Sequence, residues 1–244
     1  MKYEFDYLVV GAGSAGCVVA NRLVQGKVGK VGLLEAGGKD SNPWIHIPVG
    51  YFKTMGNPKT DWCYKTEPID GLNGRAIDWP RGKTLGGSSS INGLLYVRGQ
   101  PQDFDHWRQL GNAGWSWDEI KPLFKKLENW EDGADDVRGH DGPLKVSKNR
   151  VEREIVSAWL KSGVAAGYPW TDDYNQENQE GFGYFQMTIS NGARCSAAKA
   201  YLKPIWKNPN LEVVTNVQVS RILFDNKKAI GALAVKNGKL TEFI

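Results

Sequence analysis

Three glycines near the N-terminus have the spacing that a dinucleotide-binding turn requires. Gly11, Gly13 and Gly16 form the pattern Gly-x-Gly-x-x-Gly. The first glycine permits a tight turn, the second lets the backbone approach a pyrophosphate, and the third lets a helix pack closely on a strand. A helix that begins here presents unpaired N–H groups and the positive end of its dipole to phosphate. The pattern predicts dinucleotide binding and does not separate FAD from NAD.

An acidic residue follows at the distance that such a site needs. Glu35 lies 19 positions after Gly16, at the end of an apolar run. A carboxylate in this position accepts hydrogen bonds from the adenosine ribose hydroxyls, and its charge disfavours the 2′-phosphate of NADP.

The elements that must position these residues form one β-α-β unit. Residues 6–10 and 30–35 are short apolar runs typical of buried strands, and residues 17–24 have an apolar helical face between them. A purely structural β-α-β turn is the alternative, but strand, helix, second strand and acid are all in register.

A second glycine-rich run spans residues 81–93. Gly82-Lys83-Thr84 resembles the end of a phosphate-binding P-loop, but Ile77 stands where that motif needs glycine, so we reject it. The pair Gly86-Gly87 is followed by three serines. Backbone N–H groups and hydroxyls in such a loop suit a phosphate or a polar ring edge, and a plain Gly-Ser loop is the alternative.

A general base is not evident. Histidine is the commonest general base, and the chain has only three: His46, His106 and His140. We interpret them as a packed loop residue, a helix residue and a turn residue, and we predict no catalytic residue in this chain. The acidic run at 131–136 could bind a cation, but the run and the segment 131–141 around it are interpreted as a solvated surface connection. We predict no metal site.

Composition excludes several classes of protein. The 244 residues carry a net charge of +4, which does not argue for nucleic-acid binding. No apolar run approaches the ~18 residues needed to span a bilayer, and the N-terminus lacks the pattern of a signal peptide. Three widely spaced cysteines, Cys17, Cys63 and Cys195, suit a reducing compartment. We therefore expect a cytoplasmic protein and leave peripheral membrane association open.

The remaining pattern predicts a mixed α/β chain. Residues 40–80 lack a sustained period and are expected to be irregular. Asn237-Gly238 is a hairpin turn signal. The expected helices are 103–110, 117–130, 150–163 and 196–206, and the expected later strands are 183–189, 211–215, 218–224, 229–235 and 240–244.

The second glycine-rich run resembles the first signature of the glucose-methanol-choline (GMC) flavoprotein oxidoreductases. The resemblance rests on Gly82-Lys-Thr-Leu-Gly-Gly-Ser-Ser-Ser-Ile-Asn92, followed by Tyr96, Gly99 and Asp105. Further similar segments are Asp6–Gly16, Leu34–Gly38, Gly139–Leu144, Gly181–Gly183 and Ser196–Leu202. The likeness covers essentially the whole chain and is greatest for members similar to choline dehydrogenase and alcohol dehydrogenase.

This resemblance implies an FAD-dependent enzyme that oxidises the CH–OH group of a small alcohol. In the family a base removes the hydroxyl proton while hydride passes to flavin N5. The resemblance does not specify the electron acceptor that reoxidises the flavin. Some relatives attach FAD covalently through a histidine where this chain has Ile91, so we expect non-covalent FAD. The residues implied in cofactor binding are Gly11, Gly13, Ser14, Ala15, Gly16, Glu35, Ala36, Arg81, Thr84, Leu85, Gly86, Gly87, Ser88, Asn92, Gly93, Leu94, Leu95 and Val217.

The resemblance also implies the organisation of the chain. We expect a Rossmann-like FAD-binding domain over 1–138, the beginning of an α+β substrate-binding domain over 139–200, and a return to the FAD-binding domain over 201–244. Family members are considerably longer and carry their catalytic histidine near the C-terminus. We therefore expect an N-terminal half that is inactive alone and partners a missing C-terminal half. A non-catalytic FAD- or nucleotide-binding fragment and an NAD-linked dehydrogenase are the alternatives.

Overall fold

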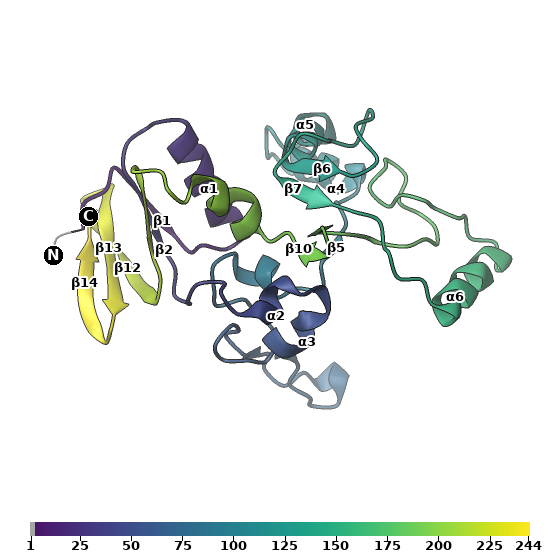
Figure 1. Ribbon diagram of the computed structural model, residues 1–244, viewed down its shortest axis with the longest axis horizontal. Coiled ribbons are helices and arrows are strands. Elements are labelled where there is room, and N and C mark those ends of the chain that lie inside the picture. Colours follow the sequence, from purple (N-terminus) through teal and green to yellow (C-terminus); the bar gives the residue numbers. More distant parts are fainter. Residues whose placement is uncertain (1–2) are drawn as a thin grey trace. The chain divides into compact units, whose positions relative to one another are not determined.

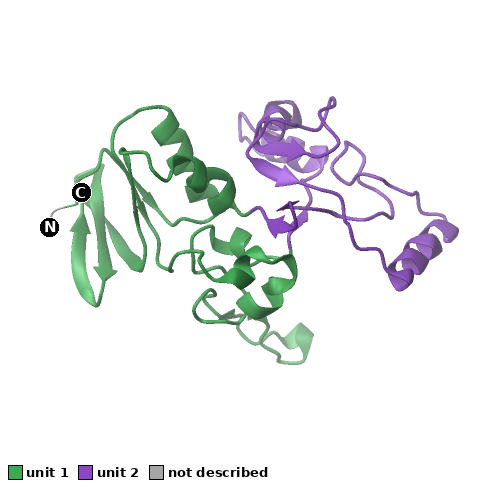
Figure 2. Ribbon diagram, viewed as in Figure 1, with its two compact units in different colours: residues 1–93, 196–244 green, residues 94–195 purple. Residues whose placement is uncertain are grey.

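The computed structural model describes residues 3–244 and divides into two compact units (Figure 2). Unit 1 combines the chain up to Gly93 with Ser196–Ile244, and unit 2 is Leu94–Cys195. The domains predicted at 1–138, 139–200 and 201–244 were defined by whether each is expected to bind FAD or substrate. The two units are defined by packing instead, so the predicted domains stay a prediction.

A parallel three-stranded sheet organises unit 1 (Figure 1). Strand β2 (Val31–Leu34) lies between β1 (Tyr7–Val10) and β11 (Leu211–Val214), in parallel register with both. All four residues of β2 are buried. A central parallel strand covered on both faces reads as a continuous apolar run, which is why the sequence pattern predicted it well.

Helix α1 (Ser14–Gln25) connects β1 to β2 and completes the predicted β-α-β unit. Its buried residues, Cys17, Ala20, Asn21 and Val24, follow one helical face. The Asn21 amide is satisfied within the core, because its Nδ2 donates to the Tyr201 carbonyl at 2.8 Å.

An antiparallel meander follows the parallel sheet in unit 1 (Figure 1). It consists of β12 (Val217–Asp225), β13 (Lys228–Lys236) and β14 (Lys239–Phe243). Asn237 and Gly238 both have positive φ, which confirms the predicted hairpin turn. Leu34 of β2, Val217 of β12 and Phe243 of β14 share one buried cluster, so the meander is packed onto the parallel sheet.

The segment predicted to be irregular contains only short elements. These are α2 (Pro43–His46), η1 (Pro48–Gly50), α3 (Tyr51–Thr54), β3 (Tyr64–Lys65), η2 (Asp70–Leu72), β4 (Asp78–Trp79) and, in the second glycine-rich run, η3 (Gly87–Ser90). The helix expected over 196–206 is instead a π-helical turn, η4 (Ala198–Leu202), followed by the 3₁₀ turn η5 (Lys203–Ile205). Pro204 lacks the N–H that a continuing α-helix would use.

Unit 2 has small sheets and three helices among its described residues. Its helices are α4 (Pro101–Gln109), α5 (Trp117–Leu127) and α6 (Glu154–Ala165). Its strands are β5 (Leu95–Tyr96), β6 (Glu128–Trp130), β7 (Leu144–Val146), β8 (Gln186–Met187), β9 (Ile189–Ser190) and β10 (Ala193–Arg194). Ser116 and Glu119 form a capping box at the start of α5.

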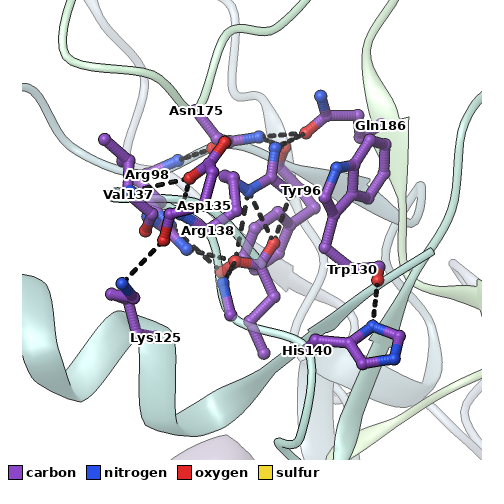
Figure 3. Close-up of polar contacts among 12 residues, drawn as sticks. Tyr96, Arg98, Lys125, Trp130, Asp135, Val137, Arg138, His140, Asn175 and Gln186 are labelled. Atoms are coloured by element: carbon purple, nitrogen blue, oxygen red, sulfur yellow. Dashed lines mark hydrogen bonds and ion pairs between the residues drawn. The ribbon is translucent and has the colours of Figure 1, made fainter. Parts of the chain in front are cut away.

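A buried ionic network holds unit 2 together (Figure 3). The Glu128 carboxylate is fully buried and forms ion pairs with Arg98 and Arg138. Arg138 also donates to Asp173 at 2.5 Å and to Gln186 at 2.9 Å. Both arginines are buried as well, so each charge is balanced inside the unit.

This network corrects two expectations. The helix predicted over 117–130 ends at Leu127, because Glu128 to Trp130 form β6 and turn the carboxylate inward. The acidic segment 131–141 is not wholly a solvated connection, since Val137 and Arg138 within it are buried. The sequence did not predict the burial of Arg138, because a buried arginine and an exposed one give the same charge pattern in a polar segment. No helix within residues 3–244 has the length and apolarity to cross a membrane.

Candidate cofactor site

The first glycine turn leaves the start of α1 open. Gly11 has φ +89°, and its N–H donates to the Leu34 carbonyl at 2.7 Å. A Cβ on Gly16 would lie 1.8 Å from the Gly11 carbonyl oxygen, so only glycine fits there. Gly13 caps α1 without a side-chain hydrogen bond. The helix start therefore offers backbone N–H groups and a positive dipole end at Ser14 and Ala15, which are exposed.

The Glu35 carboxylate braces this turn from the end of β2. Its Oε2 accepts from the Ala12 N–H and its Oε1 accepts from the Gly37 N–H, each at 2.8 Å. Burial raises the pKa of Glu35, while these two hydrogen bonds and the charge of Lys83 oppose the rise. Each oxygen keeps further acceptor capacity, so a ribose hydroxyl could still donate to it.

The second glycine loop packs directly against the first. A Cβ on Gly87 would lie 2.8 Å from the Gly13 Cα, and Gly87 has φ +52°. The Gly86 N–H donates to the Ala12 carbonyl at 2.7 Å. A glycine at position 87 is therefore required by conformation and by the close approach of the two loops.

The serines of the second loop serve mainly the loop itself. The Ser88 hydroxyl accepts from the Gly82 N–H at 3.1 Å, and the Ser90 hydroxyl donates to the Leu85 carbonyl at 2.7 Å. The Ser89 hydroxyl donates to the Gly86 carbonyl at 2.5 Å and accepts from the Ala197 N–H at 2.9 Å. The Ser89 and Ser90 hydroxyls thus donate their protons to backbone carbonyls, whereas the Ser88 hydroxyl could still donate to a ligand.

A cavity of about 370 Å³ lies where the two loops and the end of β2 meet, within the size range of small-molecule sites. Positions Gly11 and Gly13 face open space, because a Cβ on either would meet no atom within 4 Å. Six of the predicted residues line the cavity: Gly11, Gly13, Glu35, Ala36, Gly87 and Val217. Gly-lined backbone, a carboxylate and an apolar wall fit the pyrophosphate, ribose and adenine of a dinucleotide.

Other predicted residues support this cavity without lining it. Thr84 is buried, and its hydroxyl donates to the Gly38 carbonyl at 3.1 Å. The Leu85 N–H donates to the same carbonyl at 3.0 Å. Arg81 does not reach the cavity, because its guanidinium donates to the Pro80 carbonyl and lies over the Trp79 ring.

The remaining predicted residues lie at the end of unit 1 and the beginning of unit 2. Asn92 is exposed, and its N–H donates to the Ser88 carbonyl at 2.8 Å. Gly93 ends this part of unit 1, and Leu94 and Leu95 belong to unit 2. Leu94 is buried with φ +68°, and Thr188 donates to its carbonyl from both its N–H and its hydroxyl. The roles predicted for these four residues stay predictions.

Trp62 also lines the cavity, although no motif in the sequence predicted it. Its ring is stacked on Tyr64, with centroids 5.7 Å apart, and the Lys83 ammonium lies 4.5 Å from the ring centroid. Trp62 lies in the irregular segment, one of ten tryptophans with no local motif. The feature that distinguishes Trp62 is a long-range hydrogen bond, in which its N–H donates to the Arg81 carbonyl at 2.9 Å.

None of the three histidines lines this cavity. One ring nitrogen of His46 is 2.7 Å from the Asp40 carbonyl, and Nδ1 of His140 is 2.9 Å from the Trp130 carbonyl. His106 is exposed on α4. Within residues 3–244 no group of His, Cys, Asp and Glu side chains is arranged to hold a metal ion.

Comparison with known proteins relates the chain to flavoenzymes. A family model described as GMC oxidoreductase matches residues 5–244. Human mitochondrial choline dehydrogenase is 44% identical over 243 residues, which cover 97% of this chain and 41% of that protein. The chain thus spans about two-fifths of the length of this relative.

Solved structures agree with this relationship. Pyridoxine 4-oxidase from Mesorbium loti matches with a TM-score of 0.93 and 32% identity, over 98% of this chain and 47% of that one. An FAD-dependent oxidoreductase from Chaetomium thermophilum matches with a TM-score of 0.88 and 26% identity, over 98% of this chain and 43% of that one. The predicted α/β fold of the flavoprotein type is confirmed.

Proposed function

The chain belongs to the GMC oxidoreductase family, and from this premise we propose that unit 1 binds FAD non-covalently as the cofactor-binding part of an alcohol-oxidising enzyme. One observation carries the proposal: the open start of α1, the Gly87 loop and Glu35 converge on a single cavity in unit 1. The relatives named above as a choline dehydrogenase and an FAD-dependent oxidoreductase support the same cofactor and substrate class.

Each part of the cofactor has a matching part of the cavity. The N–H groups at the start of α1, beside Gly13, would hold the pyrophosphate. Glu35 would accept a ribose hydroxyl, and the wall that includes Val217 would contact the adenine. Arg81, the segment Thr84–Ser88 and the pair Asn92-Gly93, all in unit 1, would contact the flavin half.

Attachment of FAD would be non-covalent. Ile91 occupies the position at which some family members carry a flavin-linked histidine. Its side chain is 1% exposed and has no nucleophilic atom, so it packs in the protein interior instead of bonding to a ligand.

Bound FAD would supply a hydride acceptor for the oxidation of a CH–OH carbon. The chain's own residues would bind and orient this cofactor and exclude water from its pyrophosphate. They would not take the hydroxyl proton, because the rings of His46 and His140 contact backbone carbonyls. We therefore expect a proton acceptor from outside these 244 residues.

The carbonyl contacts of the His46 and His140 rings favour a second candidate function, a cofactor-binding module without catalysis of its own. The two candidates agree on FAD and differ in whether an alcohol reduces it.

A visible absorption spectrum tests the proposal. The 244-residue chain is incubated with FAD, or with NAD in a parallel sample, and then desalted. We expect a retained flavin band and no retained NAD, with flavin release on denaturation as non-covalent binding requires. Retention of NAD in place of FAD, or a colourless protein whose fold is intact by circular dichroism, would contradict FAD binding by this chain. Bleaching on addition of choline or a primary alcohol would contradict only the expected inactivity.

A further inference from the structure

A second cavity in unit 1, of about 470 Å³, is separate from the cofactor cavity. The two cavities share no lining residue. The second glycine loop lies between them, because Leu85 lines this cavity and Gly87 lines the other. The size falls in the range of sites for small molecules.

The floor of this second cavity is apolar. Leu85 and Leu202 are buried at 2% and 1% exposure, and Ala198 lies beside them in η4. Trp206 follows η5, lines the cavity and is 42% exposed. Such a floor accepts a hydrocarbon or aromatic body by removing it from water.

Positive charge surrounds this floor. Lys39, Lys199 and Lys203 line the cavity, and Asp40 is the one acidic residue among the lining residues. No ion pair or hydrogen bond engages the three lysine ammonium groups within residues 3–244. Three unpaired cations against one carboxylate leave the cavity with a positive potential that an anion would neutralise.

We propose that this cavity binds a small amphiphilic anion, with a carboxylate or phosphate head near the lysines and an apolar body on the Leu85, Leu202 and Trp206 surface. Lysine ammonium groups form charge-assisted hydrogen bonds with either head group. An uncharged molecule of the same size would lose these bonds, and an inorganic anion would lose the apolar contact. The inference does not depend on FAD binding, because no residue that lines this cavity also lines the cofactor cavity.

Isothermal titration of the full chain with octanoate, octyl phosphate and 1-octanol tests this proposal. We expect both anions to bind with one site per chain, and 1-octanol to bind at least tenfold more weakly. The better of the two anions identifies the head group. Binding of the anions should weaken as salt is raised, because the exposed lysines are screened. Equal binding of octanoate and 1-octanol would overturn the proposal.

Matched variants locate the site. The double variant Lys39→Met with Lys203→Met removes two exposed charges from the cavity, and we expect at least tenfold weaker octanoate binding. The double variant Lys59→Met with Lys207→Met removes two exposed charges elsewhere and should bind like the parent chain. Equal losses in both doubles would assign the effect to net charge and overturn the proposal.

Two further measurements keep the outcome clear. If the first double variant does not fold by circular dichroism, the single variant Lys203→Met replaces it with an expected loss of severalfold. Saturating FAD should leave octanoate binding in place. Competition between FAD and octanoate would assign this cavity to the cofactor site and overturn the proposal, while a failure of FAD to bind would leave it standing.

Discussion

The Cα of Gly13 lies 2.8 Å from the point that a Cβ on Gly87 would occupy. These glycines are 74 positions apart along the chain, and the fold brings their backbones into contact at one wall of the cavity that Glu35 also lines. This contact makes one substitution decisive. Gly87→Ala should lower FAD affinity at least tenfold, because the added methyl meets the Gly13 backbone and alanine disfavours φ +52°. Fluorescence titration of FAD measures the effect.

A matched control for Gly87→Ala exists in the same unit. Gly71 has no positive φ, and a Cβ there would meet no atom within 4 Å. Gly71→Ala should leave FAD affinity and stability unchanged. Equal FAD affinity in the two variants would contradict the contact between the loops.

Trp62→Leu should weaken FAD binding about tenfold, since stacking of an aromatic ring on a nucleobase contributes about 1–3 kcal/mol. Trp62 lines the cavity, whereas Trp44 does not and is 42% exposed. Trp44→Leu is therefore the control, and FAD titration compares the two. If Trp62→Leu bound FAD as tightly as the parent chain while Trp44→Leu lost affinity, Trp62 would not face the cofactor.

Glu35 should make the stability of unit 1 fall as the pH rises. Its pKa in the folded chain is raised above 4.5 by burial, so the protonated form is favoured by folding. Its contribution is fully present below pH 4.5 and is lost as the pH rises through the folded pKa. Urea unfolding without FAD should show the parent chain losing free energy of unfolding relative to Glu35→Gln over this range.

Glu119 provides a control of opposite sign. Hydrogen bonds from the Ser116 hydroxyl and N–H lower the pKa of Glu119 below 4.5, so its contribution is present above 4.5 and lost as the pH falls. The difference between the parent chain and Glu119→Gln should therefore grow with pH. If the free-energy difference from the parent chain changed with pH in the same direction for both variants, burial would not raise the pKa of Glu35.

Glu128→Gln should destabilise unit 2 by about 3–5 kcal/mol, because it leaves Arg98 and Arg138 buried without a carboxylate between them. Asp132→Asn removes one partner of an exposed pair with Lys148 and should change stability little. Urea unfolding compares both with the parent chain. A small effect of Glu128→Gln would show that the network is open to water.

Thiol titration should find one reactive cysteine in the native chain. Cys63 is exposed, whereas Cys17 and Cys195 are buried. Burial also raises the pKa of the Cys17 thiol to about 12, so it remains protonated at neutral pH. Cys63→Ser should abolish the fast reaction with Ellman's reagent, and unfolding should expose the other two thiols. Fast modification of Cys17 would contradict its position beneath the Ala12 carbonyl.

The sequence was most informative where local constraints act. The Gly11–Gly16 turn, the buried run of β2 and the Asn237-Gly238 hairpin were all predicted, because each depends on φ, helical period or strand burial within a few residues. The boundary of α5 was predicted less well. The local sequence of Glu128 to Trp130 does not indicate that the helix ends before Glu128. The helix ends there because the Glu128 carboxylate forms ion pairs with two distant arginines.

By itself, the sequence therefore determined the β-α-β unit, the two glycine loops, the position of Glu35 and the family. Only the tertiary structure decided that Gly87 would touch Gly13, that Trp62 would line the same cavity as Glu35, and that Arg138 would be buried with Glu128. The physical reason is the range of the interactions. Turns and strands follow from the steric limits of neighbouring residues, whereas loop contacts and buried ion pairs depend on which distant segments share the interior.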